Sequence, residues 1–553
     1  MRMNDGLRVV ARESRVKDYV LPQKILFTEG KVEGAAGLLE QKELQILIDE
    51  TDLTLCSGKT SIVFDFGKEI HGGVRLLVYA KSGTSPAFRI RFGESVAECC
   101  SDVATSSATN DHSLRDFVVP AVAMSDMEWG SSGFRFLRLD TLGEDSEISI
   151  KSVLASFVYR DLERKGSFCC SDPRWNEIYE VAAYTLQLNM QHHLWDGIKR
   201  DRLVWMGDMH PETKGIFALF GADACVTDAL DFMRDSTPLP RFINTMPTYS
   251  LWYLAVLADN YIQNGDLEYV KTHEAYATAL IRQFLGYVDE AGNLSLPQYF
   301  LDWPTFRKEG AEAGVYALFD FAMQKSETLV KAFGKQMPEI AETRKRLRKD
   351  LPDADKKQVV AFRSIAGHAD PAVCAERLVR GGAEGFSTFM SYYIARAMFE
   401  GGKGREALAL MKEYYGGMLD RGATTFWEDF HMDWLEGSSR IDELPKAGEK
   451  DLHGDYGDHC YVGFRHSFCH GWACGPVAFL AEYVLGVRVR DVACREIEIR
   501  PCLADLDWAK GSYPTPFGIV TVEHRRENGR IVTRASAPEG VRLTVLSQEN
   551  GNA

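Results

Sequence analysis

The chain has 553 residues, of which 45% are hydrophobic and 26% are charged, and these proportions are typical of a folded globular protein. This length exceeds what one hydrophobic core usually organises, so we expect about two to four domains. Acidic residues outnumber basic ones by 79 to 64, which gives a formal net charge of −15. The charge argues against nucleic-acid and anionic-membrane partners, because phosphate recognition depends on clustered basic side chains. A neutral ligand such as a sugar suits the balance better.

Cysteine usage and the N-terminal residues bear on the compartment. The 12 cysteines include no paired CxxC arrangement of the zinc type, and their dilution favours a reducing environment. Residues 1–18 carry many charges and no apolar run, so we expect no signal peptide and favour a cytoplasmic location. A periplasmic location stays open if a signal has been removed. No apolar run reaches the roughly 18 residues that a membrane span needs.

The hydrophobic pattern divides the chain into three regions. Residues 1–165 alternate with period two from about Ser61, which predicts an N-terminal β-sandwich of the jelly-roll kind, with a helical pattern only at 35–50. Residues 166–487 show helical periodicity and almost no strand signal. So many helices favour a toroid of paired helices whose loops surround a pocket at one end. Residues 488–553 return to period two, which predicts a smaller C-terminal β-sandwich.

The stretch 195–212, WDGIKRDRLVWMGDMHPE, concentrates acids, bases and tryptophans. Asp196, Asp201 and Asp208 alternate with basic residues, and glycines interrupt any regular helix, so we expect an ordered loop. Interleaved cations hold neighbouring acids while pushing their pKa values apart, as acid/base catalysis on a neutral substrate requires. Trp205 offers a flat apolar face on which a sugar ring stacks. The alternative, a buried ion-pair cluster that ties two elements together, stays open from this stretch alone.

Two further loops combine acids with aromatic residues. In 298–312, Asp302 lies beside Trp303; in 422–434, Glu428 follows Trp427. A carboxylate beside tryptophan is partly desolvated, which changes its pKa. Tyr249 follows a proline-bearing loop and divides evenly between a core role and a binding role. The histidines and cysteines of 459–474 match no zinc spacing, so core packing is preferred there and no metal is expected.

Three motifs stand out: RLVWMGD at 202–208, GATTFWE at 422–428 and EIRP at 498–501. Together with further stretches they resemble the bacterial α-L-rhamnosidase family of inverting glycoside hydrolases. RLVWMGD at 202–208 is similar to the family's R-L-x-W-x-G-D signature, and GATTFWE at 422–428 is similar to its second catalytic segment. EIRP at 498–501 and WAKGSYPTPFGIVTV at 508–522 are similar to its C-terminal β-sandwich. DFGKEIHGGVRLLV and GFRFLRL resemble the β-domain that precedes the barrel. The resemblance covers roughly residues 60 to 525.

The resemblance implies a multidomain α+β protein in which a six-hairpin (α/α)₆ barrel lies between two β-sandwiches. It implies hydrolysis of terminal α-L-rhamnose by inversion, with no metal or organic cofactor. The family's general acid, usually glutamate, falls on Asp201, and the base that activates water falls on Glu428. The residues expected to bind substrate are Asp196, Trp205, Asp208, Tyr249, Asp302, Trp303, Trp427 and His470.

The sequence departs from the family at Asp201. Aspartate is one methylene shorter than glutamate, about 1.5 Å of reach, and a misplacement of about 1 Å can cost a hundredfold in rate. Two alternatives therefore stand beside a rhamnosidase. One is a related (α/α)₆ glycosidase for another deoxyhexose or hexose, and the other is a catalytically impaired sugar-binding homologue. A homodimer stays open.

Overall fold

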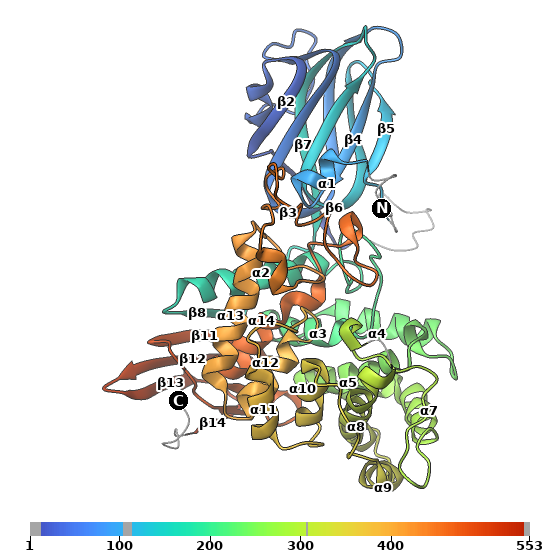
Figure 1. The fold of residues 1–553 in the computed structure, drawn as a ribbon, viewed down its shortest axis with the longest axis vertical. Helices are drawn as coiled ribbons and strands as arrows, with labels where there is room; N and C mark the ends of the chain where they lie inside the picture. The colour runs from blue at the N-terminus through green and yellow to red at the C-terminus, as the bar shows by residue number, and fades with distance from the viewer. Residues whose placement is uncertain (1–12, 103–112, 306–307, 547–553) are drawn as a thin grey trace, which may run out of the picture.

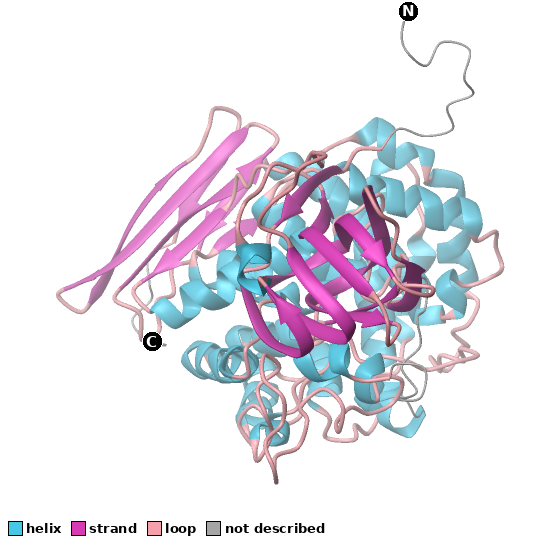
Figure 2. Ribbon diagram, turned by 90° about the horizontal axis from the view of Figure 1, so that it is seen from above, coloured by secondary structure: helices cyan, strands magenta, loops and turns pink. Residues whose placement is uncertain are grey.

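The computed structural model describes residues 13–102, 113–305 and 308–546. The N-terminal sheet stands at one end of the long axis, and the helices occupy the other end beside the C-terminal strands (Figure 1). Seen from above, the N-terminal sheet lies over the helices, and the C-terminal strands project to one side (Figure 2). Within the described ranges, no helix has both the length and the apolar character needed to cross a membrane.

The N-terminal domain is built on one curved antiparallel sheet of seven strands in the order β1-β7-β3-β6-β4-β5, with β2 paired to β3. The strands are β1 (Val16–Val20), β2 (Lys24–Glu33), β3 (Thr54–Ser82), β4 (Ala87–Gly93), β5 (Asp116–Pro120), β6 (Ser125–Leu142) and β7 (Glu147–Tyr159). The alternating residues Phe64, Ile90 and Leu139 are buried in the core of this domain, as their period predicts. The helical pattern at 35–50 yields only the 3-10 helix Ala35–Leu39. The short helix α1 (Val96–Cys100) follows β4.

Helices form the middle of the chain. They are α2 (Pro173–Asn189), α3 (Met209–Leu219), α4 (Ala224–Ser236), α5 (Pro247–Asn264), α6 (Leu267–Thr272), α7 (Glu274–Leu285), α8 (Lys308–Ala332), α9 (Pro338–Arg346), α10 (Lys357–Ile365), α11 (Pro371–Val379), α12 (Ser391–Glu400), α13 (Gly404–Asp420) and α14 (Gly475–Phe479). Contacts run from α3 through α5, α8, α10 and α12 to α14 and back to α3, so these helices close a ring. Asp172 caps α2 by accepting from the Arg174 backbone, and Pro173 occupies its first turn, as expected.

The C-terminal strands form two small sheets. They are β9 (Val487–Val489), β10 (Glu496–Ile499), β11 (Trp508–Thr515), β12 (Gly518–Glu527), β13 (Arg530–Ser536) and β14 (Arg542–Val545). One sheet has the order β14-β10-β9 and the other β13-β12-β11-β8. Strand β8 (Ser167–Cys170) pairs with β11, although we expected the residues after 165 to open the helical domain. The C-terminal sheets share a continuous hydrophobic core with the helices, whereas the N-terminal domain has a core of its own.

Candidate active site

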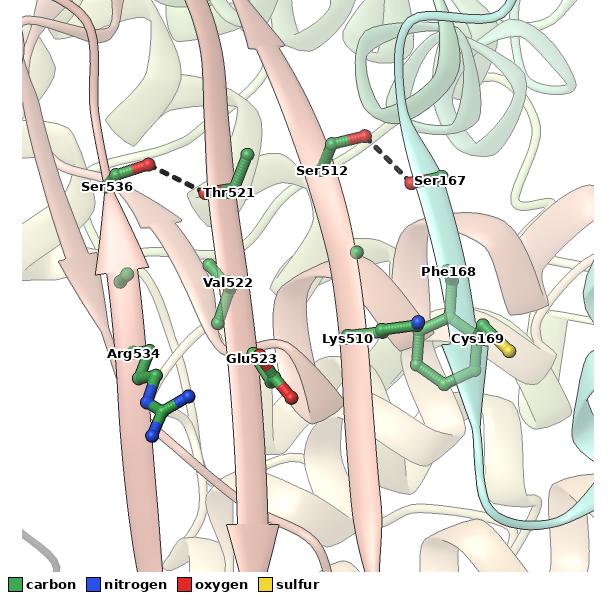
Figure 3. A pocket seen from close by; sticks show the side chains of 12 residues that line it. Ser167, Phe168, Cys169, Lys510, Ser512, Thr521, Val522, Glu523, Arg534 and Ser536 are labelled. Atoms are coloured by element: carbon green, nitrogen blue, oxygen red, sulfur yellow. Dashed lines mark hydrogen bonds between the residues drawn. The ribbon is translucent and has the colours of Figure 1, made fainter.

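Two pockets are compared as candidates for the active site. The first, of about 510 Å³, lies on the four-stranded C-terminal sheet (Figure 3). Hydroxyl pairs cross its strands, with Ser167 Oγ 2.8 Å from Ser512 Oγ and Thr521 Oγ1 2.7 Å from Ser536 Oγ. Glu523 is the one acid among the residues that line it. A single carboxylate cannot supply both the acid and the base of a hydrolysis, so this hollow is not the candidate active site.

The second hollow, a cavity of about 320 Å³, gathers four carboxylates among the loops of the helical domain. It is lined by Asp196, Arg200, Asp201, Trp205, Asp208, Asn244, Thr245, Met246, Tyr249, Gln298, Phe300, Trp303, Glu428, Cys460, Tyr461, Arg465, His470 and Trp472. Arg200 and Glu428 are 228 residues apart in the chain and are in contact here. Apolar walls with a few convergent polar groups are the usual composition of a small-molecule site.

The loop that carries Asp201 is held by its own backbone. The Asp196 backbone N–H donates to the Leu203 carbonyl at 3.1 Å, and Asp196 Oδ1 accepts from the Leu203 N–H at 2.9 Å. Asp201 and Arg202 have φ angles of 53° and 54°, a left-handed conformation that non-glycine residues seldom adopt. Such strain persists only where the surroundings impose it, and it is common at functional sites. The acid-rich stretch is therefore an ordered loop, as the sequence predicts.

Glu428 is buried and is held at both carboxylate oxygens. Oε1 contacts the Arg200 guanidinium and lies 3.4 Å from His470 Nε2, while Oε2 accepts from the Ser467 N–H at 3.1 Å. Burial by itself raises the pKa of this carboxyl, but the nearby charges of Arg200 and His470 outweigh burial and hold the pKa well below its ordinary value. Glu428 is therefore ionised near neutral pH and able to accept a proton.

Asp196 and Asp208 have the opposite electrostatic character. Burial raises the pKa of both carboxyls well above the ordinary value; neighbouring acids raise it further. Tyr249 donates its hydroxyl proton to Asp208 Oδ1 at 3.2 Å. His470 Nε2 lies 3.8 Å from Asp196 and 3.9 Å from Asp208, so one imidazole lies close to three of the four acids. A raised pKa favours the protonated form, and a protonated carboxyl can both donate to and accept from sugar hydroxyls.

Aromatic rings line the same cavity as these acids. The rings of Trp205 and Tyr249 meet edge to face with their centroids 5.9 Å apart, and Trp303, Phe300, Trp472 and Tyr461 also belong to the lining. A Cβ at Gly207 would lie 2.5 Å from the Tyr249 ring, so the glycine in the signature makes room for this tyrosine. The predicted binding residues Trp205, Tyr249 and Trp303 therefore all line the cavity.

Two predicted binding residues do not line it, which corrects the interpretation of their loops. Asp302 is buried outside the lining, where it accepts from Ser387 Oγ at 2.5 Å, and burial raises its pKa to about 7. Trp427 stacks on Phe468 with ring centroids 4.4 Å apart and is fully buried. Both loops contribute their neighbours instead, Trp303 and Glu428. In a loop or extended segment, two neighbouring side chains point in different directions. The sequence pattern alone does not reveal which member of the pairs Asp302/Trp303 and Trp427/Glu428 faces the cavity.

Other lining residues were not anticipated. Asn244 fixes the signature loop by accepting from the Met206 N–H at 3.0 Å and donating to the Val204 carbonyl at 2.9 Å. Tyr461 and Arg465 come from the segment that was considered for zinc and assigned to core packing. The prolines around 238–247 predict a loop near Asn244 but do not show that it lies at the cavity. Nothing in the sequence of 459–465 indicates that Tyr461 and Arg465 line it.

The matches to known families fall on the helical and C-terminal regions. Residues 163–313 match the family model of the bacterial alpha-L-rhamnosidase 6 hairpin glycosidase domain, and residues 486–552 match that of the bacterial alpha-L-rhamnosidase C-terminal domain. No curated protein sequence matches the chain.

Solved structures agree in fold. A GH78 family rhamnosidase of Bacillus sp. GL1 is 21% identical with a TM-score of 0.74, over 92% of this chain and 55% of that one. A rhamnosidase from Klebsiella oxytoca with rhamnose bound is 20% identical with a TM-score of 0.66, over 85% and 96% of the two chains. The Streptomyces avermitilis α-L-rhamnosidase complexed with L-rhamnose is 16% identical with a TM-score of 0.67, over 88% and 48%. The chain thus spans about 55% of the length of the Bacillus enzyme.

Residues 163–313, which carry Asp196, Asp201 and Asp208 of the acid-lined cavity, match a domain of the six-hairpin glycosidase class. Both matched segments, 163–313 and 486–552, are similar to domains of the bacterial α-L-rhamnosidase family, in agreement with the resemblance found in the sequence motifs.

Proposed function

We propose that this protein is an inverting glycoside hydrolase that removes terminal α-L-rhamnose from glycans or glycosides. The observation that carries the proposal is the cavity that gathers Asp196, Asp201, Asp208 and Glu428 in different surroundings: Arg200 holds the pKa of Glu428 well below its ordinary value, whereas burial raises the pKa of Asp196 and Asp208. Hydrolysis of a glycoside by inversion uses two carboxyl groups, one as acid and one as base. The ring of contacts among the inner helices supports an (α/α)₆ toroid as the frame of this site.

Asp201 takes the role of general acid in this proposal. Its side chain is 22% exposed, whereas Asp196, Asp208 and Glu428 are 3–4% exposed, so Asp201 is the acid placed to reach a glycosidic oxygen and exchange protons with water. It protonates the leaving oxygen as the bond to the anomeric carbon breaks. Glu428 removes a proton from a water that attacks the opposite face of the sugar ring. Because two carboxyls supply both proton transfers, the proposal requires no metal or organic cofactor.

The identity of the sugar rests on the structural neighbours. The Klebsiella and Streptomyces structures hold rhamnose, and their folds match this chain over 85% and 88% of its length. In this chain, Asp196, Asp208 and His470 face the same cavity as Trp205. A pocket that combines polar groups with an aromatic face suits a ring that carries both hydroxyls and an apolar patch. A related glycosidase for another deoxyhexose or hexose would use the same arrangement.

A specific observation favours a second candidate, a sugar-binding homologue with impaired catalysis. Asp201 stands where the family usually has glutamate, and its Oδ1 is held 2.9 Å from an Arg200 nitrogen. A shorter side chain tied to a guanidinium has less reach toward a glycosidic oxygen.

Hydrolysis of an aryl α-L-rhamnoside, with the product anomer followed by NMR, tests the proposal. We expect β-L-rhamnose to form first and then mutarotate. Initial release of the α-anomer would overturn inversion. Turnover confined to other glycosides would identify a different sugar, and calorimetric binding of L-rhamnose without turnover of any glycoside would support the impaired homologue.

A further inference from the structure

A buried group of charged residues lies between the N-terminal domain and the active-site loops. Glu94 and Glu98 come from the turn and short helix after β4, and they meet Lys199 and His453, with each of the four at most 1% exposed. Lys199 Nζ lies 3.0 Å from Glu94 Oε2 and 3.1 Å from Glu98 Oε1. It also donates to the Phe464 carbonyl at 3.0 Å. Burying ionisable groups is costly unless each finds partners, and here they do.

The cluster could be mistaken for a metal site. Among the described residues, Glu94, Glu98 and His453 offer ligand atoms that all lie within 4.8 Å of one another. The Lys199 ammonium, however, lies within 3.3 Å of a ligand atom of all three. A built-in cation in that place repels a second one, so the group acts as a structural anchor.

Glu94 connects this anchor to the catalytic base. Its Oε1 accepts from Ser467 Oγ at 3.1 Å, and its Oε2 accepts from the Phe468 N–H at 2.5 Å. The Ser467 N–H in turn donates to Glu428 Oε2 at 3.1 Å, and the Ser467 carbonyl accepts from the Glu428 N–H at 2.9 Å. One carboxylate of the N-terminal domain therefore fixes the segment that orients Glu428.

Glu94 also connects to the loop of the general acid. Lys199 immediately precedes Arg200, which contacts Glu428, and Asp201 follows. The ion pair between Glu94 and Lys199 thus fixes the start of the segment from which both side chains project. The acid loop and the base segment, far apart in sequence, are held by the same carboxylate.

We propose that Glu94 is a positioning residue through which the N-terminal β-domain sets the distance between Asp201 and Glu428. The inference rests on the proposed hydrolysis, because it assigns those two residues the roles of acid and base. It also gives the N-terminal domain a part in catalysis beyond covering the helices.

The test is Glu94→Gln, which keeps the shape of the side chain. The amide of this glutamine accepts hydrogen bonds at its oxygen only, and it carries no negative charge to balance the Lys199 ammonium. We expect kcat for an aryl α-L-rhamnoside to fall about tenfold to a hundredfold, since a shift of about 1 Å costs that much. KM should stay within about threefold, and the acid limb of kcat/KM should move to higher pH as Glu428 leaves Arg200. The conservative variant Glu94→Asp should recover part of kcat.

Glu69→Gln is the matched control. Glu69 is buried, which raises its pKa well above its ordinary value, and among the described residues Ser467 Oγ donates to Glu94 and not to Glu69. An isosteric amide at 69 should leave kcat and the pH profile unchanged. An equal loss in both variants would show that disturbing the buried charges, and not the loss of positioning, lowers the rate.

A crystal structure of the Glu94→Gln protein separates this inference from the proposed function. We expect the contact between the Ser467 nitrogen and Glu428 Oε2 to be broken, whatever the substrate. Unchanged geometry, or a normal kcat in an active enzyme, would overturn the positioning role. A displaced Glu428 in the variant, together with a wild-type protein that hydrolyses no glycoside, would sink the proposed function alone. If Glu94→Gln does not fold, Ser467→Ala removes the hydroxyl link, and a kcat equal to that of the wild type would then overturn the inference.

Discussion

Arg200 contacts Glu428 through one terminal nitrogen of its guanidinium and Asp201 through the other, the latter at 2.9 Å. The guanidinium is held in place by donation from its Nε to the Arg465 carbonyl at 2.9 Å. A planar fork with fixed donors suits this task better than a lysine would. The residue therefore links the two carboxyls assigned to opposite ends of one reaction, and its charge sets the protonation state of the base.

Removal of that charge should change the pH profile. In Arg200→Met, burial of Glu428 is no longer outweighed, so its pKa rises and the acid limb of kcat/KM should move up by about one pH unit or more. Because the folded pKa of Glu428 lies below its unfolded value of 4.5, its contribution to stability is present above pH 4.5. That contribution is lost as the pH falls through the folded pKa, and the variant should lack it. Arg202→Met is the control, since Arg202 does not line the cavity.

The role of Asp201 as acid predicts a dependence on the leaving group. In Asp201→Asn, aryl rhamnosides with poor leaving groups should lose about 10²–10⁴ in kcat, because general acid catalysis typically contributes that much. A dinitrophenyl rhamnoside, which leaves without protonation, should retain most of its rate. Asp196→Asn serves for comparison, since a residue that binds hydroxyls should slow both substrates alike. Equal loss on both substrates in Asp201→Asn would remove Asp201 from the acid role.

Lengthening the same side chain tests whether reach limits the rate. Asp201→Glu restores about 1.5 Å and should raise kcat tenfold or more if the native loop holds the carboxyl too far from the glycosidic oxygen. A fall in kcat would show that the loop, with its left-handed Asp201, already places the shorter acid correctly. Steady-state kinetics on one aryl rhamnoside decides between the two.

Glu428 as base predicts rescue by a small anion. Glu428→Ala should lower kcat by about 10²–10⁴. Azide, which needs no deprotonation, should restore turnover by entering the vacated space and should yield the β-L-rhamnosyl azide. The same treatment of Asp201→Asn should give no β-azide rescue with poor leaving groups. Formation of the α-azide in Glu428→Ala would contradict a single displacement.

The sequence predicted the broad organisation because periodicity is a local property. Alternation marked the strands that bury Phe64 and Ile90, and helical spacing marked the region where Trp175 and Ile178 are buried. It missed the pairing of β8 with β11, since a pair of strands separated by more than 300 residues leaves no local pattern. The signature loop was found because glycines and alternating charges in so short a stretch are unusual.

The sequence predicted most residues of the candidate site but not all of them. Eight of the ten residues proposed for it line the cavity, because acids and aromatics flank the loops that form it. Asp302 and Trp427 do not line the cavity although their neighbours Trp303 and Glu428 do, since adjacent side chains leave an irregular backbone in directions that composition does not encode. Nothing in the sequence linked Glu94 to Ser467, because an inter-domain contact between an acid and a hydroxyl has no spacing rule.

Gly471 offers a test of how tightly His470 is held. A Cβ there would lie 1.6 Å from Glu212 Oε1, which belongs to a buried carboxyl whose pKa is raised by burial and by the nearby Asp208 and Asp196. Gly471→Ala should therefore destabilise the protein by about 1–3 kcal/mol, as overpacking does, and shift His470 away from Glu428 with a fall in kcat. Adding Glu212→Ala to the Gly471→Ala protein should relieve the clash and recover part of the stability and part of kcat. Gly286→Ala is the control, because Gly286 is exposed at a helix end and a Cβ there would lie 3.3 Å from the Gln283 carbonyl oxygen. Thermal unfolding and kinetics of the three variants measure the coupling, and failure of the second substitution to recover stability would place the strain elsewhere.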